Sequence, residues 1–211
     1  HHAIIKYCNR PFAIKCSSCN EWNKDCKDCK ALTIPNQEAE LIKRWNAKVN
    51  ENDLVYNFGD FIWTDDADLW VSIVERLKGR QRILVGNHDK LICDRNGVAK
   101  PYANLPQQIR NLVDNGQIEW IKNYYEEKIH GQYITMMHFP LAAHHKSMYG
   151  SWMLHGHTHG THETSWPCST KHGRIADVGV DCHDYAPVSF DELKVIMGSC
   201  SNELKKEFEN A

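Results

Sequence analysis

The stretch Trp152-Met153-Leu154-His155-Gly156-His157-Thr158-His159-Gly160 is a short apolar run that ends at a glycine and then presents two histidines one residue apart. An apolar run of this length predicts a buried strand, and glycines after it favour a loop with positive φ or a close backbone approach. Imidazole nitrogens are common metal ligands, which makes His157 and His159 candidate ligands. The stretch therefore predicts a strand that delivers metal-binding side chains at its carboxyl end.

Three other apolar runs end in the same way. Residues 54–58 lead into Gly59-Asp60, residues 82–85 into Gly86-Asn87-His88-Asp89, and residues 133–137 into His138. One strand-end histidine or one Gly-Asp pair would more often be a surface residue or a simple turn. In an open α/β sheet, however, ligands gather outside the carboxyl ends of the strands, so the four ends can converge. The set predicted to converge is Asp60, Asn87, His88, His138, His157 and His159.

The order of these blocks resembles the calcineurin-like metallophosphoesterase family, in which Gly-Asp, Gly-Asn-His-Asp or Glu, a strand-end His and Gly-His-x-His follow one another. Residues 4–12, 178–181 and 187–192 are similar to the small bacterial and phage branch, and the resemblance covers nearly the whole chain except residues 16–29. It implies an α/β fold, a metallophosphoesterase-like sandwich of mixed β-sheets flanked by helices. It also implies a metal-dependent hydrolase that cleaves phosphomonoesters or phosphodiesters, nucleotide-like ones included, with a dinuclear metal centre.

The resemblance also implies a role for each conserved block. Two divalent ions (Mn²⁺, Fe or Zn²⁺) activate a water and stabilise charge on the phosphoryl oxygens. Asp60 would bridge these ions, His88 would contact the phosphate as a catalytic group without binding metal, and Asp89 would orient His88 through a hydrogen bond. The implied metal ligands are Asp60, Asn87, His138 and His157 for one ion, with His159 for the other.

Four further residues have weaker assignments. His1 and His144 are candidates for supporting a ligand or contacting substrate, although an exposed loop position is the simpler interpretation of His144. His155 is expected to fill the strand or to support a ligand from behind. Asp177 stands where the family usually has Asn before Val-Gly, a departure expected to alter the hydrogen bonding around the ligands without replacing one.

One block of the family pattern, an Asp-x-His near the amino terminus, is absent from the given chain, which begins at His1-His2. We expect this block in residues upstream, because losing a central strand along with it would expose much apolar surface. A true truncation, which costs one ion two ligands, and a tag remnant at His1-His2 are the alternatives.

Two Cys-x-x-Cys pairs separated by six residues lie near the amino terminus, at Cys16, Cys19, Cys26 and Cys29. Each pair can fold as a tight turn, and four thiolates together suit one structural Zn²⁺. Free thiols and two local disulfides are the alternatives. We place the cysteines in an insertion at about residues 13–34 of a single domain, 1–211. Since four thiolates leave a zinc ion no open position, the ion is expected to brace the insertion and not to catalyse.

Composition limits the classes of function. A chain of 211 residues suits one substantial α/β domain. A net charge of −2 and a pI near 6.7 give no broad argument for nucleic acid or membrane partners, so a small phosphoester is the favoured substrate. Nine cysteines without a complete pairing pattern, and no apolar run of the ~18 residues that span a bilayer, favour a cytoplasmic location. The alternatives are a nuclease and a non-catalytic scaffold that binds a partner through the cysteine insertion.

The rest of the pattern predicts alternating helices and strands. Helices are expected at residues 38–49, at residues 64–77 and, as a short element in a longer loop, within residues 91–117. A hairpin is expected around His130-Gly131, followed later by a strand at residues 175–178. Ser189-Phe190-Asp191-Glu192 has the form of a capping box and predicts a final helix.

Overall fold

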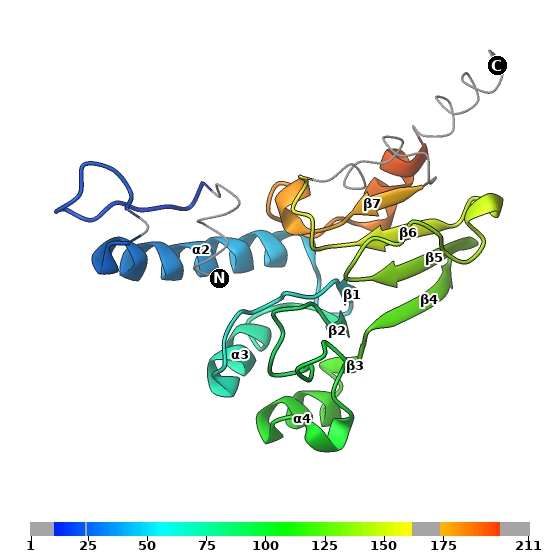
Figure 1. Cartoon of the computed structure of the whole chain (residues 1–211), viewed down its shortest axis with the longest axis horizontal. Helices are drawn as coiled ribbons and strands as arrows, with labels where there is room; N and C mark the ends of the chain where they lie inside the picture. The colour runs from blue at the N-terminus through cyan, green and yellow to red at the C-terminus, as the bar shows by residue number, and fades with distance from the viewer. Residues whose placement is uncertain (1–10, 24, 162–173, 199–211) are drawn as a thin grey trace, which may run out of the picture.

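The computed structural model describes residues 11–23, 25–161 and 174–198, which form a mixed α/β molecule with two sheets flanked by helices (Figure 1). The predictions for His1 and for the first ten residues lie outside this described part. None of the helices in it has the length and hydropathy that a membrane span requires.

The first sheet is entirely parallel and has the strand order β1-β2-β3. Its strands are β1 (Leu54–Asn57), β2 (Arg80–Leu84) and β3 (Ile118–Lys122). Helix α3 (Ala67–Val74) connects β1 to β2, and the 3-10 turn η1 (Tyr102–Asn104) and helix α4 (Gln107–Asp114) precede β3. Both helices pack against the sheet, where they bury one apolar cluster that includes Trp70, Val74, Ile83, Ile109, Leu112 and Ile118.

The second sheet is mixed and has the order β4-β5-β6-β7. Strands β4 (Tyr124–Ile129) and β5 (Gln132–Met137) form the expected antiparallel hairpin. Strands β6 (Trp152–His155) and β7 (Ile175–Asp177) then add in parallel, with η2 (Ser147–Tyr149) between β5 and β6. The sheets and the helix at residues 190–198 share a second apolar cluster, which includes Leu84, Met136, Leu154, Ala176, Leu193 and Met197.

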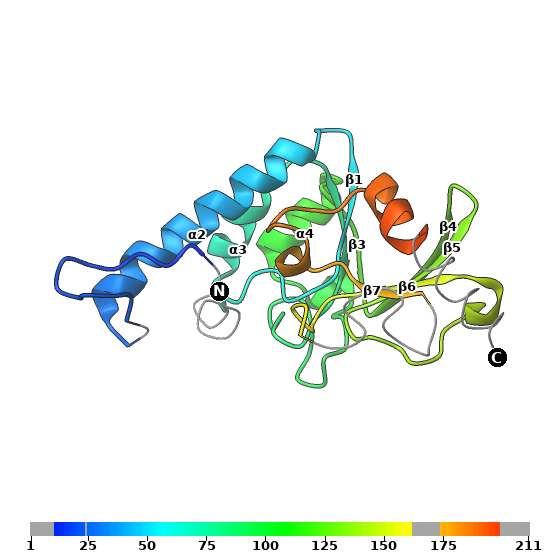
Figure 2. The same cartoon turned by 90° about the horizontal axis from the view of Figure 1, so that it is seen from above.

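Helix α2 (Lys27–Lys48) is longer than predicted, because it begins well before Pro35 and not after it. Pro35 removes one backbone donor but has a φ that suits a helix. The segment ahead of the helix compensates by running beside it: Thr33 Oγ1 accepts from Ile14 N at 2.8 Å, and Asn36 donates to Phe12 O at 3.1 Å. The amino-terminal half of α2 projects away from the sheets, while its carboxyl half packs on them (Figure 2).

The structure contains one strand that was not predicted, has one helix that is shorter than predicted, and confirms one predicted helix cap. Strand β3 was not predicted, because its five residues do not alternate strictly and follow a mixed segment. Helix α3 ends at Val74 and not at Leu77, and the Asp66 side chain caps it by accepting from two backbone N–H groups. The capping box is confirmed, since Glu192 N donates to Ser189 Oγ at 3.2 Å and Ser189 N donates to Glu192 Oε2 at 2.8 Å.

Candidate metal centre

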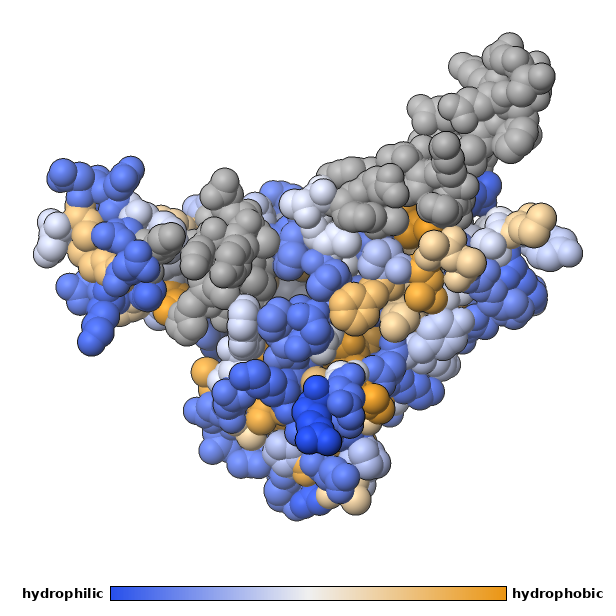
Figure 3. Space-filling view, in the orientation of Figure 1, coloured by the Kyte–Doolittle hydropathy of each residue, from blue (hydrophilic) through white to orange (hydrophobic). Residues whose placement is uncertain are grey.

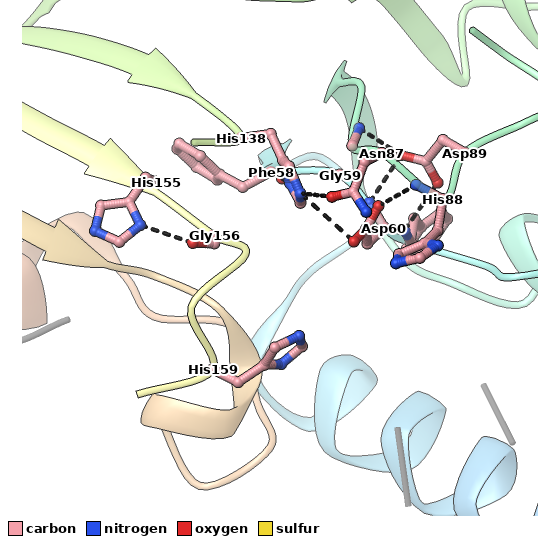
Figure 4. A network of polar contacts seen from close by, with 12 residues as sticks. Phe58, Gly59, Asp60, Asn87, His88, Asp89, His138, His155, Gly156 and His159 are labelled. Atoms are coloured by element: carbon pink, nitrogen blue, oxygen red, sulfur yellow. Dashed lines mark hydrogen bonds and ion pairs between the residues drawn. The ribbon is translucent and has the colours of Figure 1, made fainter. Parts of the chain in front are cut away.

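Four of the predicted ligands meet where the two sheets face each other. Ligand atoms of Asp60, His138 and His157 all lie within 4.8 Å of one another, and Asn87 Oδ1 is 3.0 Å from His138 Nε2. These residues follow β1, β5, β6 and β2 respectively, so each sheet contributes two of them. Figure 4 shows Asp60, Asn87 and His138 pointing towards one another. We call Asp60, Asn87, His138 and His157 the strand-tip cluster.

The orientation of His138 leaves its Nε2 facing two oxygen atoms that act as hydrogen-bond acceptors. Its Nδ1 lies 2.6 Å from the carbonyl oxygen of Phe58 and must donate to it, which turns Nε2 towards Asn87 Oδ1 at 3.0 Å and Asp60 Oδ2 at 3.5 Å (Figure 4). Both facing oxygens are acceptors, so either a proton on Nε2 or a metal ion must lie between them. A backbone carbonyl that fixes one imidazole nitrogen is the arrangement by which proteins present the other to a metal.

The pKa shifts of Asp60 and His138 also favour a positive charge between these two side chains. Burial opposes ionisation of Asp60, yet the adjacent His138 ring and the His88 backbone N–H hold the pKa of Asp60 below its ordinary value. Burial likewise opposes protonation of His138, but the Asp60 carboxylate raises the pKa of that ring. For His157, burial and then the neighbouring His138 lower the pKa, which keeps its imidazole neutral and able to ligate.

Two glycines allow the loops after β1 and β2 to touch. Gly59 has a φ of +84°, and a Cβ on it would lie 2.4 Å from Gly86 N. A Cβ on Gly86 would lie 2.2 Å from Asp60 Oδ1. Asp60 and His157 themselves have φ of 51° and 68°, a region that non-glycine residues seldom adopt and that often marks functional sites.

Asp89 does not play the predicted role. It is only 2% exposed, and its carboxylate accepts from Gly86 N at 2.8 Å, Asp60 N at 2.8 Å and Phe61 N at 3.1 Å. Burial, together with the nearby Asp60 charge, raises the pKa of this carboxyl despite the three donors. Asp89 therefore ties the loops after β1 and β2 together and does not hydrogen-bond to His88 as expected.

The His88 ring is held by an aromatic neighbour that the sequence did not indicate. Its imidazole stacks on the indole of Trp63, with the ring centroids 4.1 Å apart and the planes at 26°. The backbone N of His88 donates to Asp60 Oδ1 at 2.7 Å. Phe139 was missed as well: it is 38% exposed and packs edge-on against both His138 and His157. Its place after a strand-end His is the only sequence signal that could have found it.

His159 lies apart from the strand-tip cluster (Figure 4). Its Nδ1 is 2.7 Å from a carboxylate oxygen of Asp181, which lies in the 3-10 turn η4 (Val180–Cys182). Asp177 supports the loop between the two histidines: its carboxylate accepts from the Thr158 hydroxyl at 2.6 Å and from Gly160 N at 3.3 Å. Whether Asn would change these bonds stays a prediction.

The other histidines stay outside the cluster. His155 is fully buried, with Nδ1 2.7 Å from Gly156 O, so it fills the strand and supports the loop that carries His157. His144 places Nε2 3.3 Å from Ser151 O, and burial lowers its pKa. The structure does not bring His144 to the strand-tip cluster, and His1 lies outside the described residues.

The cysteines form a second cluster at the far end of α2. The Sγ atoms of Cys16, Cys19, Cys26 and Cys29 lie within 4.8 Å of one another, and none of the described cysteines forms a disulfide. The Cys16 and Cys26 sulfurs are 3.8 Å apart; a tetrahedron with Zn–S bonds of about 2.3 Å has edges of about 3.8 Å. We call these four residues the cysteine cluster.

Only the first cysteine pair forms the predicted isolated turn, which Cys19 N closes by donating to Cys16 O at 3.2 Å. The second pair belongs to α2, because Cys26 is its N-cap and Cys29 lies in its first turn. The backbone N–H groups of Asn23 and Cys16 lower the pKa of the Cys29 thiol to about 7, which favours a thiolate there.

A cavity of about 1270 Å³ opens beside the strand-tip cluster. Residues of β1, of α2 and of the inner face of the second sheet line it, together with Asp60, Trp63 and His157. The strands β1 and β7 that border it are the edge strands of their sheets. Figure 3 shows apolar residues in the middle of the face in view, where the two sheets meet, next to a hydrophilic surface over α3 and α4.

Comparisons with known proteins give relatives without an assigned function. No family model matches the chain. The chain is similar to an uncharacterized protein of Methanocaldococcus jannaschii, 29% identical over 192 residues that cover 90% of this chain and 81% of that protein. A solved structure, of a protein of unknown function from Aquifex aeolicus, superposes with a TM-score of 0.48 at 21% identity, covering 75% of this chain and 84% of the other.

Proposed function

We propose that this protein is a metal-dependent hydrolase of phosphoester bonds, with a metallophosphoesterase-like fold and a small phosphoester as substrate. The observation that carries the proposal is the meeting of Asp60 Oδ2, Asn87 Oδ1 and His138 Nε2 beside His157. Mixed oxygen and imidazole ligands suit Mn²⁺, Fe or Zn²⁺. The resemblance of the four blocks to the calcineurin-like family supports the same reaction.

The residues in and beside the strand-tip cluster have separate roles in the proposed hydrolysis. Bound divalent ions supply an activated water and relieve charge on the phosphoryl oxygens. Asp60 accepts a hydrogen bond from His88 N at 2.7 Å, so the carboxylate and the proposed acid are held in one unit. His88 is then beside the cluster to stabilise the phosphoryl group or to protonate the leaving oxygen. Trp63 stacks on the His88 ring, and Phe139 packs edge-on against His138 and His157.

The proposal includes a second ion, with His159 among its ligands. His157 and His159 lie one residue apart on the loop that follows β6, and both line the same cavity as Asp60.

We also propose that the cysteine cluster holds one structural Zn²⁺. The spacing of the sulfurs matches a tetrahedral site, and the four cysteines lie outside the apolar clusters of the two sheets, so an ion would brace the segment. Metal analysis of the protein should find one zinc in addition to the ions of the catalytic centre.

Hydrolysis of bis-p-nitrophenyl phosphate with added Mn²⁺ tests the proposal. Asp60→Asn should lower kcat/KM at least about a hundredfold, because the carboxylate that holds the ions is lost. The matched control is Asp191→Asn, whose side chain is 86% exposed on the carboxyl-terminal helix and should leave the rate unchanged. Undiminished turnover in Asp60→Asn would overturn the assignment. A protein that binds one zinc and hydrolyses no phosphoester would instead be the non-catalytic scaffold.

A further inference from the structure

We propose that Trp63 is the positioning residue for His88: its stacked indole holds the imidazole beside Asp60, the task that the sequence pattern assigns to Asp89. This inference rests on the proposed hydrolase function and on the role in which His88 protonates the leaving oxygen.

The geometry of the pair is that of a stack. The ring centroids are 4.1 Å apart and the planes are inclined by 26°. Stacked aromatic rings attract each other across such a distance, and the flat contact limits rotation of the imidazole about its side-chain torsions. Both side chains are half-buried, so the stack leaves part of the imidazole open to the cavity that Trp63 lines.

The loop that carries Trp63 is itself well anchored. On one side Ile62 is buried in the α3 and α4 core, and on the other Asp66 caps α3. Two hydrogen bonds close the loop around Trp63: Thr64 N donates to Ile62 O at 3.0 Å, and Asp66 N donates to Thr64 Oγ1 at 3.0 Å. The indole therefore offers a fixed surface and does not depend on His88 for its own position.

Asp89 is already engaged with other partners. One of its oxygens accepts from Asp60 N and Gly86 N, and the other accepts from Phe61 N. The carboxylate thus fixes the loop that leads to Trp63. Its effect on the His88 ring is therefore indirect, through the position of that loop. The hydrogen bond from His88 N to Asp60 fixes the main chain but leaves the side-chain torsions free, so the ring orientation depends on the stack.

A misplaced acid harms poor leaving groups more than good ones, because a good leaving group departs without a proton. Trp63→Leu keeps an apolar side chain but removes the flat surface. We expect it to lower kcat at least about tenfold for a phenyl phosphoester, only a few-fold for the p-nitrophenyl ester, and to leave KM nearly unchanged. Trp63→Phe should restore most of the rate for both esters.

A double-variant comparison separates positioning from direct substrate contact. In the His88→Gln background, Trp63→Leu should cause no further loss of kcat on either ester. An equal loss in the presence and absence of His88 would overturn the proposal, as would an equal loss for both leaving groups. Trp120→Leu, at a half-buried tryptophan of β3, is the matched control for folding and should not show the leaving-group dependence.

Proton NMR of the histidine rings at one fixed pH tests the stack without relying on activity. His88→Gln identifies the His88 signals, which the indole ring current should displace to high field in the native protein. Trp63→Leu should return them to their ordinary position, while Trp120→Leu should not. Unmoved signals would overturn the inference even in an active protein. A protein inactive on every ester but with displaced signals would overturn the proposed function while leaving the stack established; Trp63→Met serves as a second variant if Trp63→Leu does not fold.

Discussion

The strand-tip cluster and the cysteine cluster each gather four side chains of the kinds that bind metals, but they do so on very different scales. The cysteine cluster comes from residues 16–29 and depends on one turn and the start of α2. The strand-tip cluster comes from residues 60–157 and depends on two sheets. The cysteine cluster therefore depends on contacts within one short segment, whereas the strand-tip cluster depends on how two sheets pack.

Packing between distant segments accounts for the difference. His138 is 1% exposed and is hydrogen-bonded to Phe58 of the opposite sheet, so its position follows from packing. The cysteine cluster sits on the projecting end of α2, away from the three apolar clusters. Helix α2 connects the two regions, since Cys29 is in its first turn and Trp45 near its end packs on Val49 and Leu77.

The largest effect is expected from removing one cysteine. Cys29→Ser should abolish zinc binding, because the apparent binding energy of a structural zinc, about 10–16 kcal/mol, depends on all four thiolates. Hydrogen exchange should then show loss of protection at the start of α2 and unchanged protection in both sheets. Cys182→Ser, outside the cluster, should keep the zinc. Simultaneous loss of protection in the sheets would contradict the separation of the two regions.

The second effect concerns the close approach of two loops. Gly59→Ala should destabilise the protein by about 2–4 kcal/mol and weaken metal binding at the strand-tip cluster, because the added Cβ meets the backbone of Gly86. Urea unfolding and metal titration measure both changes. Gly97→Ala is the matched control, with a φ of +74° and no atom within 4 Å of the added Cβ. It should cost only the backbone strain, about 1 kcal/mol.

A smaller effect is expected from a substitution at Asp177, which supports the loop that carries His157. Asp177 is 1% exposed and accepts hydrogen bonds from Thr158 and Gly160. Thr158 and Gly160 share Oδ2, while Gly179 N donates to Oδ1 at 2.7 Å. In Asp177→Asn the NH₂ group must face a donor on one side or the other, so the loop that carries His157 loosens. Metal affinity at the strand-tip cluster should fall about tenfold, while zinc in the cysteine cluster stays bound. Unchanged affinity in a calorimetric titration would show that the loop is held by other contacts.

The smallest effect is expected from the ion pair that joins α2 to the carboxyl-terminal helix. Lys48 Nζ is 2.7 Å from Glu192, and this pair with the Ser189 N–H lowers the pKa of Glu192 to about 2. A lowered folded-state pKa means that the contribution to stability is present above the unfolded value near 4.3 and is lost as pH falls towards 2. Glu192→Gln should therefore cost at most about 1 kcal/mol at pH 6, since the pair is half exposed, and only a small fraction of that at pH 2, where about half of the folded protein has Glu192 protonated. Urea unfolding of both proteins at the two pH values measures this, and an equal difference at both would contradict it.

Much of the site could be predicted because strand ends are visible in the sequence. Apolar runs that end at Gly59 and Gly86, or at His138, identify where side chains leave a sheet, and parallel strands bring such ends to one edge. The helix through Pro35 and the short β3 could not be predicted, because local propensity argues against the first and hardly supports the second. Both exist because packing against neighbouring elements outweighs propensity.

The roles of single side chains can also be separated into those that the sequence determines and those that the tertiary structure decides. The sequence alone determined that Asp60, Asn87, His138 and His157 are ligand types at strand ends and that Cys16 to Cys29 can share an ion, because spacing and residue chemistry are local properties. Only the tertiary structure decided that Asp89 binds backbone groups, that Trp63 and not Asp89 holds the His88 ring, and that His159 pairs with Asp181. Those contacts join segments far apart in the chain, and which partner a buried group finds depends on how the sheets and loops pack around it.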